Sequence, residues 1–191
     1  MFNDFVTRSN WVDIFVLIIV FRIGYIAMRT GIMIEIFKFG GVISSIYISS
    51  HYYTILSDFI KQRLPGEFMP LEILDFLSFI ILLTLGYLIF VLLRSICRNF
   101  IKLDSPSIIN RWTGLALGIL RGYLISGIVI FTMVISSVAY FKNSSAHSYF
   151  AKQLFEVQPG VYAWLWNNIG SKLIKSEKFN PTVGEVKEDI K

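Results

Sequence analysis

The stretch of sequence that decides the fold is residues 110–126, which read NRWTGLALGILRGYLIS. From the first glycine onward, a glycine or serine recurs at every fourth position, so on a helix these small side chains form one narrow stripe. Helices in a lipid bilayer associate through close backbone approach, which small side chains permit. We therefore predict a helix-packing stripe made of Gly114, Gly118, Gly122 and Ser126.

Arg121 stands beside this stripe, inside an apolar run that continues from Leu115 to Val134. A charged side chain at membrane depth is costly, so it is expected to face protein or water and to have a partner. The alternative is a solvent-facing arginine at a helix end. The length of the apolar run favours an arginine within the membrane.

The composition is typical of an integral membrane protein. Hydrophobic residues make up 54% of the 191 residues and charged residues only 16%, against roughly 25% charged residues in a soluble domain. Apolar runs close to membrane-spanning length recur along the chain, so we predict an all-α membrane protein whose first partner is the lipid bilayer. The net charge of +5 comes largely from basic residues at the ends of these runs. That placement indicates lipid headgroups, not nucleic acid, as their partner.

Four transmembrane helices are expected, at about residues 11–28, 31–56, 71–94 and 108–140. Together they form a multi-pass membrane domain over residues 1–141. Residues 142–174 interleave aromatic and polar side chains, which predicts amphipathic helices in the membrane interface, interrupted at Pro159-Gly160. Residues 175–191 are rich in charge and are predicted to be a disordered tail.

A second stripe of small residues is expected on the second helix, at Gly41, Ser45 and Ser49. Each stripe of small side chains needs a surface that allows close backbone approach, and the other stripe is such a surface. We therefore expect this stripe to pack against that of the fourth helix. The alternative is that the serines only bond to carbonyls of their own helix.

Five charged residues fall inside the expected spans, namely Asp13, Arg22, Glu35, Asp75 and Arg121. Asp13 and Arg22 point to different sides of their helix, so each needs a separate partner, a water path or a route to the interface. Glu35 lies three residues before Lys38 and is expected to pair with it on one helix face. Asp75 is expected to cap the third helix, with pairing to an arginine as the alternative.

A basic face follows the third apolar run. Arg94, Arg98 and Lys102 recur there at four-residue spacing. We interpret this face as an anchor on phospholipid headgroups. The positive-inside rule then places the loop between the third and fourth helices in the cytoplasm.

The sequence contains no recognisable catalytic constellation. It has no Gly-x-Ser-x-Gly, no phosphate-binding loop and no carboxylate pair in a recognisable site, so the chain is expected not to be an enzyme. The single cysteine excludes an internal disulfide. His51 and His147 stand alone and are interpreted as interfacial side chains, so no metal or other cofactor is expected.

A longer pattern joins these features across about the first 140 residues. Its elements, in order, are Trp11-x-Asp13, Gly24, Arg29, Gly31, Glu35, Gly41, Ser50-His51-Tyr52-Tyr53 and Arg111-x-x-Gly114-x-x-x-Gly118-x-x-Arg121-Gly122. In this order and spacing the chain resembles the colicin V production protein (CvpA) family of bacterial inner-membrane proteins. In that family an acidic residue commonly precedes the arginine of the last motif, whereas this chain has Asn110.

The resemblance implies a role in producing or exporting the peptide toxin colicin V, and in envelope homeostasis. Two functions fit the residues. In the first, the protein is an accessory component whose stripes pack helices within one subunit or a homo-oligomer, and which works through export or envelope partners. In the second, the intramembrane charges line an oligomeric ion channel or a small-solute transporter. The resemblance favours the first.

Overall fold

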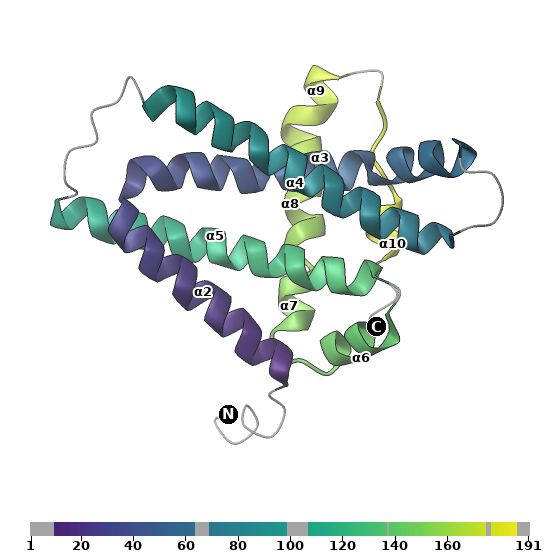
Figure 1. Ribbon diagram of the computed structural model, residues 1–191, viewed down its shortest axis with the longest axis horizontal. Coiled ribbons are helices and arrows are strands. Elements are labelled where there is room, and N and C mark those ends of the chain that lie inside the picture. The colour runs from purple at the N-terminus through teal and green to yellow at the C-terminus, as the bar shows by residue number, and fades with distance from the viewer. Residues whose placement is uncertain (1–9, 64–68, 99–106, 137, 175–176, 187–191) are drawn as a thin grey trace.

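Four long helices make up most of the protein (Figure 1). The computed structural model describes residues 10–63, 69–98, 107–136, 138–174 and 177–186. The long helices are α2 (Trp11–Thr30), α3 (Ile32–Arg63), α4 (Leu71–Arg98) and α5 (Ile108–Ile135). All four are long and apolar enough to cross a membrane, and the described residues contain no strand. The all-α membrane fold that the sequence predicts is confirmed.

The first helix is defined by residues at its two ends. Asn10 caps α2, and its backbone N–H donates to the Asp13 carboxylate at 2.9 Å in a capping box. Gly31 ends α2 with a φ of 76°, a left-handed conformation that glycine adopts readily and other residues rarely do. The chain therefore turns from α2 into α3 at a single residue.

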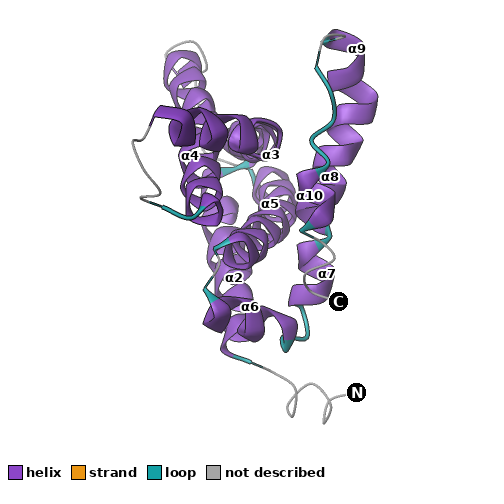
Figure 2. Cartoon of the chain, turned by 90° about the vertical axis from the view of Figure 1, so that its right-hand side faces the viewer, coloured by secondary structure: helices purple, strands orange, loops and turns teal. Residues whose placement is uncertain are grey.

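The long helices form a bundle with a second layer on one side. In Figure 1, α3 and α5 run across the view, α4 passes in front of α3 in the opposite direction, and α2 crosses below α5. The shorter helices are α6 (Ala139–Ala146), α7 (Ala151–Phe155), α8 (Val157–Leu165), the π-helix η1 (Trp166–Gly170), α9 (Ser171–Leu173) and α10 (Thr182–Glu185). Figure 2 shows that α7, α8 and α9 form a column on the opposite side of the bundle from α4.

The expected amphipathic helices form, and their apolar sides pack on the bundle. The helix α7 contacts α5, while α8 contacts both α3 and α5. Leu154, Phe155 and Tyr162 are buried there. The interruption expected at Pro159-Gly160 lies instead at Glu156, between α7 and α8. Proline is tolerated within α8 because it falls in the first turn, where its missing N–H would have no helical partner.

The helix α3 extends beyond its expected end near Leu56 and stops at Arg63. The extended part includes Ser57, which is buried and whose hydroxyl donates to the carboxylate of Asp75 on α4. The expectation that Asp75 caps α4 is therefore wrong, and among the described arginines none pairs with it. Instead, Asp75 joins the last turns of α3 to the first turns of α4.

The helix α5 ends at Ile135, before the expected end at Tyr140. The Ser136 hydroxyl donates to the Met133 carbonyl at 2.7 Å, which satisfies a backbone group that the helix would otherwise use to continue. The chain resumes as the separate helix α6, which holds Tyr140.

The tail is ordered where it is described, contrary to the expectation of disorder. Asn180 and Val183 are buried, and the Asn180 side-chain amide donates to the Ser50 carbonyl of α3 at 2.9 Å. Residues 177–186 are thus held against the bundle. The rest of the expected tail, residues 175–176 and 187–191, lies outside the described residues, as does Lys102 of the basic face.

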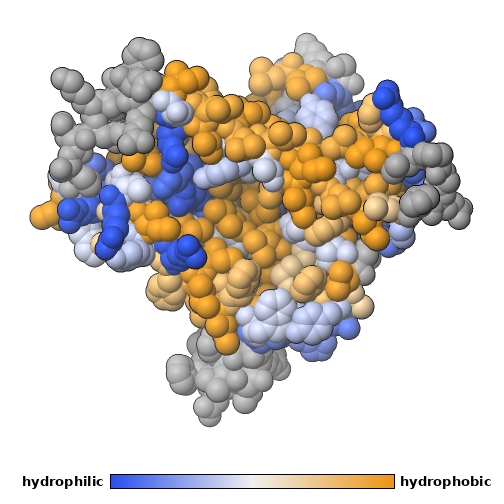
Figure 3. All heavy atoms as spheres, viewed as in Figure 1, coloured by the Kyte–Doolittle hydropathy of each residue, from blue (hydrophilic) through white to orange (hydrophobic). Residues whose placement is uncertain are grey.

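A line of aromatic rings forms the centre of the core. The ring centroids of Tyr53 and Phe79 lie 5.9 Å apart, those of Phe79 and Phe131 lie 5.4 Å apart, and those of Phe131 and Phe155 lie 5.6 Å apart. This line joins α3, α4, α5 and α7. The outer surface is also apolar over most of the face in Figure 3, which is expected of a protein surrounded by lipid.

Candidate functional site

The stripe on α5 lies directly against α2. A Cβ built on Gly118 would stand 2.2 Å from the Cβ of Ala27, and one built on Gly114 would stand 2.9 Å from the Ala27 carbonyl oxygen. Real side chains do not come this close. Only glycine at these two positions lets the backbones of α2 and α5 approach as they do.

The same interface continues along both helices. A Cβ on Gly122 would stand 3.2 Å from the Val20 Cα, and one on Gly24 of α2 would stand 3.2 Å from the Leu115 side chain. Ser126, the last member of the α5 stripe, is fully buried. Small residues on both helices therefore make this contact.

The stripe on α3 lies against α4 instead. A Cβ on Gly41 would stand 3.1 Å from the Cβ of Phe90, and one on Gly86 of α4 would stand 2.8 Å from the Ser45 Cα. Ser45 and Ser49 also donate to carbonyls of their own helix, at 2.9 and 2.7 Å. The expectation that the two stripes pack on each other is therefore wrong, because the small residues that meet each stripe lie on α2 and α4.

The turn between α2 and α3 is held by α5. The Asn110 side-chain oxygen accepts the backbone N–H of Ile32 at 2.7 Å, and it lies 3.0 Å from where a Gly31 Cβ would stand. Asn110 thereby satisfies an N–H at the start of α3 that has no partner within its own helix. The residue that departs from the CvpA pattern thus caps a neighbouring helix, a role that an acidic side chain could also fill.

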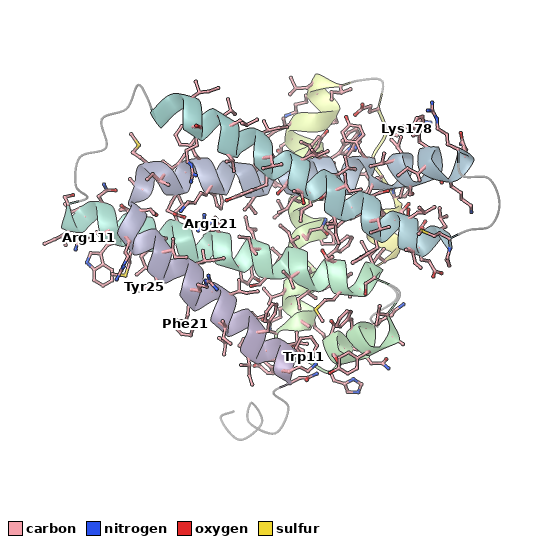
Figure 4. The ribbon with its side chains drawn as sticks, in the orientation of Figure 1. Trp11, Phe21, Tyr25, Arg111, Arg121 and Lys178 are labelled. Atoms are coloured by element: carbon pink, nitrogen blue, oxygen red, sulfur yellow. The ribbon has the colours of Figure 1, made fainter. Side chains whose placement is uncertain are left out.

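A buried ion cluster of Glu35, Lys38 and Arg121 lies close to this turn. Arg121 places a guanidinium nitrogen 3.0 Å from one Glu35 oxygen, and the Lys38 amine lies 2.5 Å from the other. The Thr30 hydroxyl donates to that second oxygen at 2.7 Å. Figure 4 shows Arg121 between α5 and α3. The cluster therefore joins the ends and faces of three helices.

This cluster carries an excess of positive charge. Glu35 is fully buried and Arg121 is only 5% exposed, so neither has access to bulk water. The predicted pairing of Glu35 with Lys38 is confirmed. Two cations nevertheless share one carboxylate, and the Nε atom of Arg121 has no hydrogen-bond partner among the described residues.

Asp13 occupies a second buried site, near the start of α2. Its carboxylate accepts the Ser148 hydroxyl at 2.6 Å and the backbone N–H groups of Phe150 and Tyr149 at 2.9 and 3.2 Å. With the Asn10 N–H, four donors meet its two oxygens, so the carboxylate is satisfied without a cation. Asp13 therefore fastens α2 to the segment that leads into α7.

Asp13→Asn is expected to lower the free energy of unfolding by about 2 kcal/mol, because hydrogen bonds to a charged acceptor are lost. The new amide would also present hydrogens to groups that are themselves donors. Thermal unfolding of the purified protein in detergent measures the change. Asp58 is exposed, so Asp58→Asn is the matched control. Equal melting temperatures for the two variants would contradict the role assigned to Asp13.

A third polar cluster surrounds His51 of α3. Its Nδ1 lies 2.9 Å from the Tyr162 hydroxyl and its Nε2 lies 2.8 Å from a Glu177 oxygen. The rings of Tyr47 and Trp166 stack on the imidazole at centroid distances of 5.5 and 5.0 Å. Only 3% of His51 is exposed. The interpretation of His51 as an interfacial side chain is wrong, because the C-terminal segments cover it.

The Tyr162 hydroxyl joins the tail to His51 of α3. The backbone N–H of Asn180 donates to the Tyr162 oxygen at 3.0 Å. Burial raises the pKa of Tyr162 to about 12, so the hydroxyl keeps its proton. The Tyr162 oxygen lies against Nδ1 of His51 and a Glu177 oxygen lies against Nε2, so both ring nitrogens have a partner. This chain of bonds holds the tail against α3.

The remaining motif residues lie near the surface. The ring of Trp11 stacks on Tyr140 with centroids 6.1 Å apart, which joins α2 to α6. The guanidinium of Arg29 lies over the Tyr25 ring, 4.6 Å from its centroid. Arg111 is exposed at the start of α5, where Figure 4 places it at one end of the bundle.

Arg22 differs from the other intramembrane charges, because it is exposed on α2. Its neighbours Phe21 and Tyr25 are also exposed, by 74% and 57%. Among the residues that the structure describes, none forms a hydrogen bond or ion pair with Arg22. Of the alternatives that the sequence leaves open for Arg22, a partner among the described residues is not found, which leaves a water path, a route to the interface or a partner outside the chain.

Comparison with known protein families shows which of these clusters lie in a region shared with relatives. A family model described as "Colicin V production protein" matches residues 12–159. The chain belongs to this family. No curated protein and no solved structure matches the chain. The colicin V production protein match includes Asp13 and the whole ion cluster, whereas Tyr162 and Glu177 lie beyond its end.

The clusters contain the side chains that sequence reasoning missed. Ser148, Tyr162, Glu177 and Asn180 all bond to residues of the long helices, although they lie in segments read as linker, interface or tail. No sequence signal distinguishes them from the other polar residues of those segments. Across the described part of the chain, no group of three or more His, Cys, Asp or Glu residues could hold a metal ion.

Proposed function

We propose that this protein is a non-enzymatic accessory component of the bacterial inner membrane, which it crosses several times. In this role it supports colicin V production or export, and envelope homeostasis, through protein partners. The observation that carries the proposal is the use of the buried charges. Arg121 and Lys38 are bound to Glu35, and Asp13 is bound by backbone and hydroxyl donors, so these groups hold segments together.

The partner surface in this proposal is the outer face of α2. Figure 4 shows Phe21 and Tyr25 on the side of α2 away from α5, and Arg22 is exposed beside them. An arginine in an apolar surface needs acceptors from outside the chain. A carboxylate or carbonyl of a membrane partner would supply them, and the flanking aromatic rings would supply apolar contact.

Native mass spectrometry of the protein, extracted gently from its own membrane, tests this proposal. A complex with an export or envelope component is expected, and Arg22→Gln is expected to reduce its yield several-fold. Arg63→Gln at the exposed end of α3 is the control. A monomer without partners would contradict the accessory role. A complex that Arg22→Gln leaves intact would contradict the outer face of α2 as the partner surface.

An oligomeric ion channel or small-solute transporter is the second candidate, which the unpaired Arg22 also favours. In a ring of copies, this residue would line a polar path between subunits. A homo-oligomer in the same measurement would support this function, and ion flux into proteoliposomes that Arg22→Gln reduces would support it further. Wild-type flux equal to that of empty liposomes would exclude an ion channel.

A further inference from the structure

A shallow pocket that is open to the surroundings lies between α3 and α4, beside the ion cluster. It is lined by Phe37, Lys38, Tyr87, Phe90, Val91 and Arg94. Two of these side chains are cations, three are aromatic and none is acidic. This combination is suited to an anionic group attached to an apolar body.

The two cations have hydrogen-bond donors to spare. Lys38 gives one bond to Glu35 and has two further N–H groups. Arg94 is partly exposed and forms no ion pair with any described residue. Glu35 is the acceptor for both Lys38 and Arg121. The pocket and the cluster together therefore hold three cations against one carboxylate, and a bound anion would offset the excess.

We propose that this pocket binds the phosphate group of an anionic phospholipid. Arg and Lys are the side chains that bind phosphate oxygens most strongly, and Arg94 can do so through two nitrogens. The pocket lies at the end of the bundle where α4 ends and α5 begins, and hydrophilic side chains gather there, at the left of Figure 3. Arg29 and Arg111 are also exposed at this end.

The apolar lining of the pocket is suited to the start of an acyl chain. Phe37, Phe90 and Val91 line it beside the two cations. Phe90 and Tyr87 lie about one and two turns before Arg94 on the same face of α4, so this lining extends from the arginine toward the middle of the span. Inorganic phosphate would satisfy the cations without using this surface, whereas a phospholipid uses both.

Thermal unfolding in detergent, with added phosphatidylglycerol, tests the proposal. Phosphatidylglycerol is expected to raise the melting temperature, since a ligand that binds the folded state stabilises it. Phosphatidylcholine and inorganic phosphate are expected to have little effect. Lys38→Gln combined with Arg94→Gln is expected to weaken phosphatidylglycerol binding on the order of tenfold. Lys61→Gln combined with Arg63→Gln, at the exposed far end of α3, is the charge-matched control.

Arg94→Gln alone separates lipid binding from protein stability, because Arg94 pairs with no described residue and its loss leaves the ion cluster intact. This single variant is expected to weaken binding about fivefold. Unchanged phosphatidylglycerol binding in the double variant would overturn the proposal. Protection by inorganic phosphate equal to that by phosphatidylglycerol would overturn the lipid as the ligand.

Discussion

Replacing Glu35 with alanine is expected to destabilise the helix bundle by about 3 to 5 kcal/mol, the usual effect of removing one partner from a buried ion pair. Glu35 is fully buried, and its two oxygens bind Arg121, Lys38 and Thr30. Without the carboxylate, the buried Arg121 and the partly buried Lys38 remain close together after losing the acidic group that they share. Unfolding of the purified variant by heat or by a denaturing detergent measures the loss.

Two further variants test whether the destabilisation comes from leaving a buried cation without its carboxylate. Glu35→Gln combined with Arg121→Gln removes both members of the pair, so it is expected to cost much less than the sum of the two single changes. Glu72 is exposed near the start of α4, and Glu72→Ala is expected to have little effect. If Glu35→Ala unfolds at the wild-type temperature, the cluster does not hold the bundle together.

Measurements of unfolding and of ion flux on Arg121 variants together test the proposed function. If Arg121 lined a conducting path, its replacement would change ion flux in a protein that remains folded. The ion pair with Glu35 predicts instead that replacing Arg121 destabilises the bundle, so that the variant would not remain folded for a comparison of ion flux. A stable Arg121→Gln variant with altered flux would therefore favour the channel over the accessory role.

The sequence predicts the four long helices well, because the length and apolarity of each run are local properties. It also predicts that Arg121 needs a partner, since this follows from its depth in the membrane. It does not identify the partner. The sequence offers Asp75 as a possible partner of an arginine, but the packing of α3 between α4 and α5 places Glu35 beside Arg121, while Ser57 holds Asp75.

Stripes of small residues identify surfaces of close approach but not their mates. The stripe on α5 meets Ala27 and Gly24 of α2, and Ser45 on α3 meets the single Gly86 of α4. One glycine in an otherwise leucine-rich helix makes no periodic pattern. The helix that receives a stripe can therefore lack any signal of its own, which is why the predicted pairing of the two stripes failed.

The C-terminal segments show a second limit of pattern reasoning. An amphipathic helix with aromatic residues has the same sequence whether its apolar face meets lipid or another helix. In this protein α8 buries Tyr162 beside His51, and Asn180 in the tail bonds to Ser50. Charge in the tail predicted disorder, but Asn180 and Val183 provide enough buried contact to hold residues 177–186.

Gly118→Leu is expected to destabilise the protein by roughly 3 kcal/mol or more, because a bulky side chain would force α2 away from α5. Even a Cβ at this position would stand 2.2 Å from the Cβ of Ala27. Cross-linking between cysteines introduced on α2 and α5 measures their separation, and thermal unfolding measures the stability. Gly160 has open space around its Cα, so a substitution there controls for the loss of a glycine.

A compensating pair of small changes isolates the contact itself. Gly118→Ala is expected to cost about 1 to 3 kcal/mol, because its new methyl group collides with that of Ala27. Ala27→Gly removes the colliding methyl group, so the double variant moves it from one helix to the other and should recover much of the loss. The double variant keeps the number of methyl groups constant, and such recovery can come only from relief of the clash. Additive destabilisation by the two changes would mean that α2 and α5 do not meet at these residues.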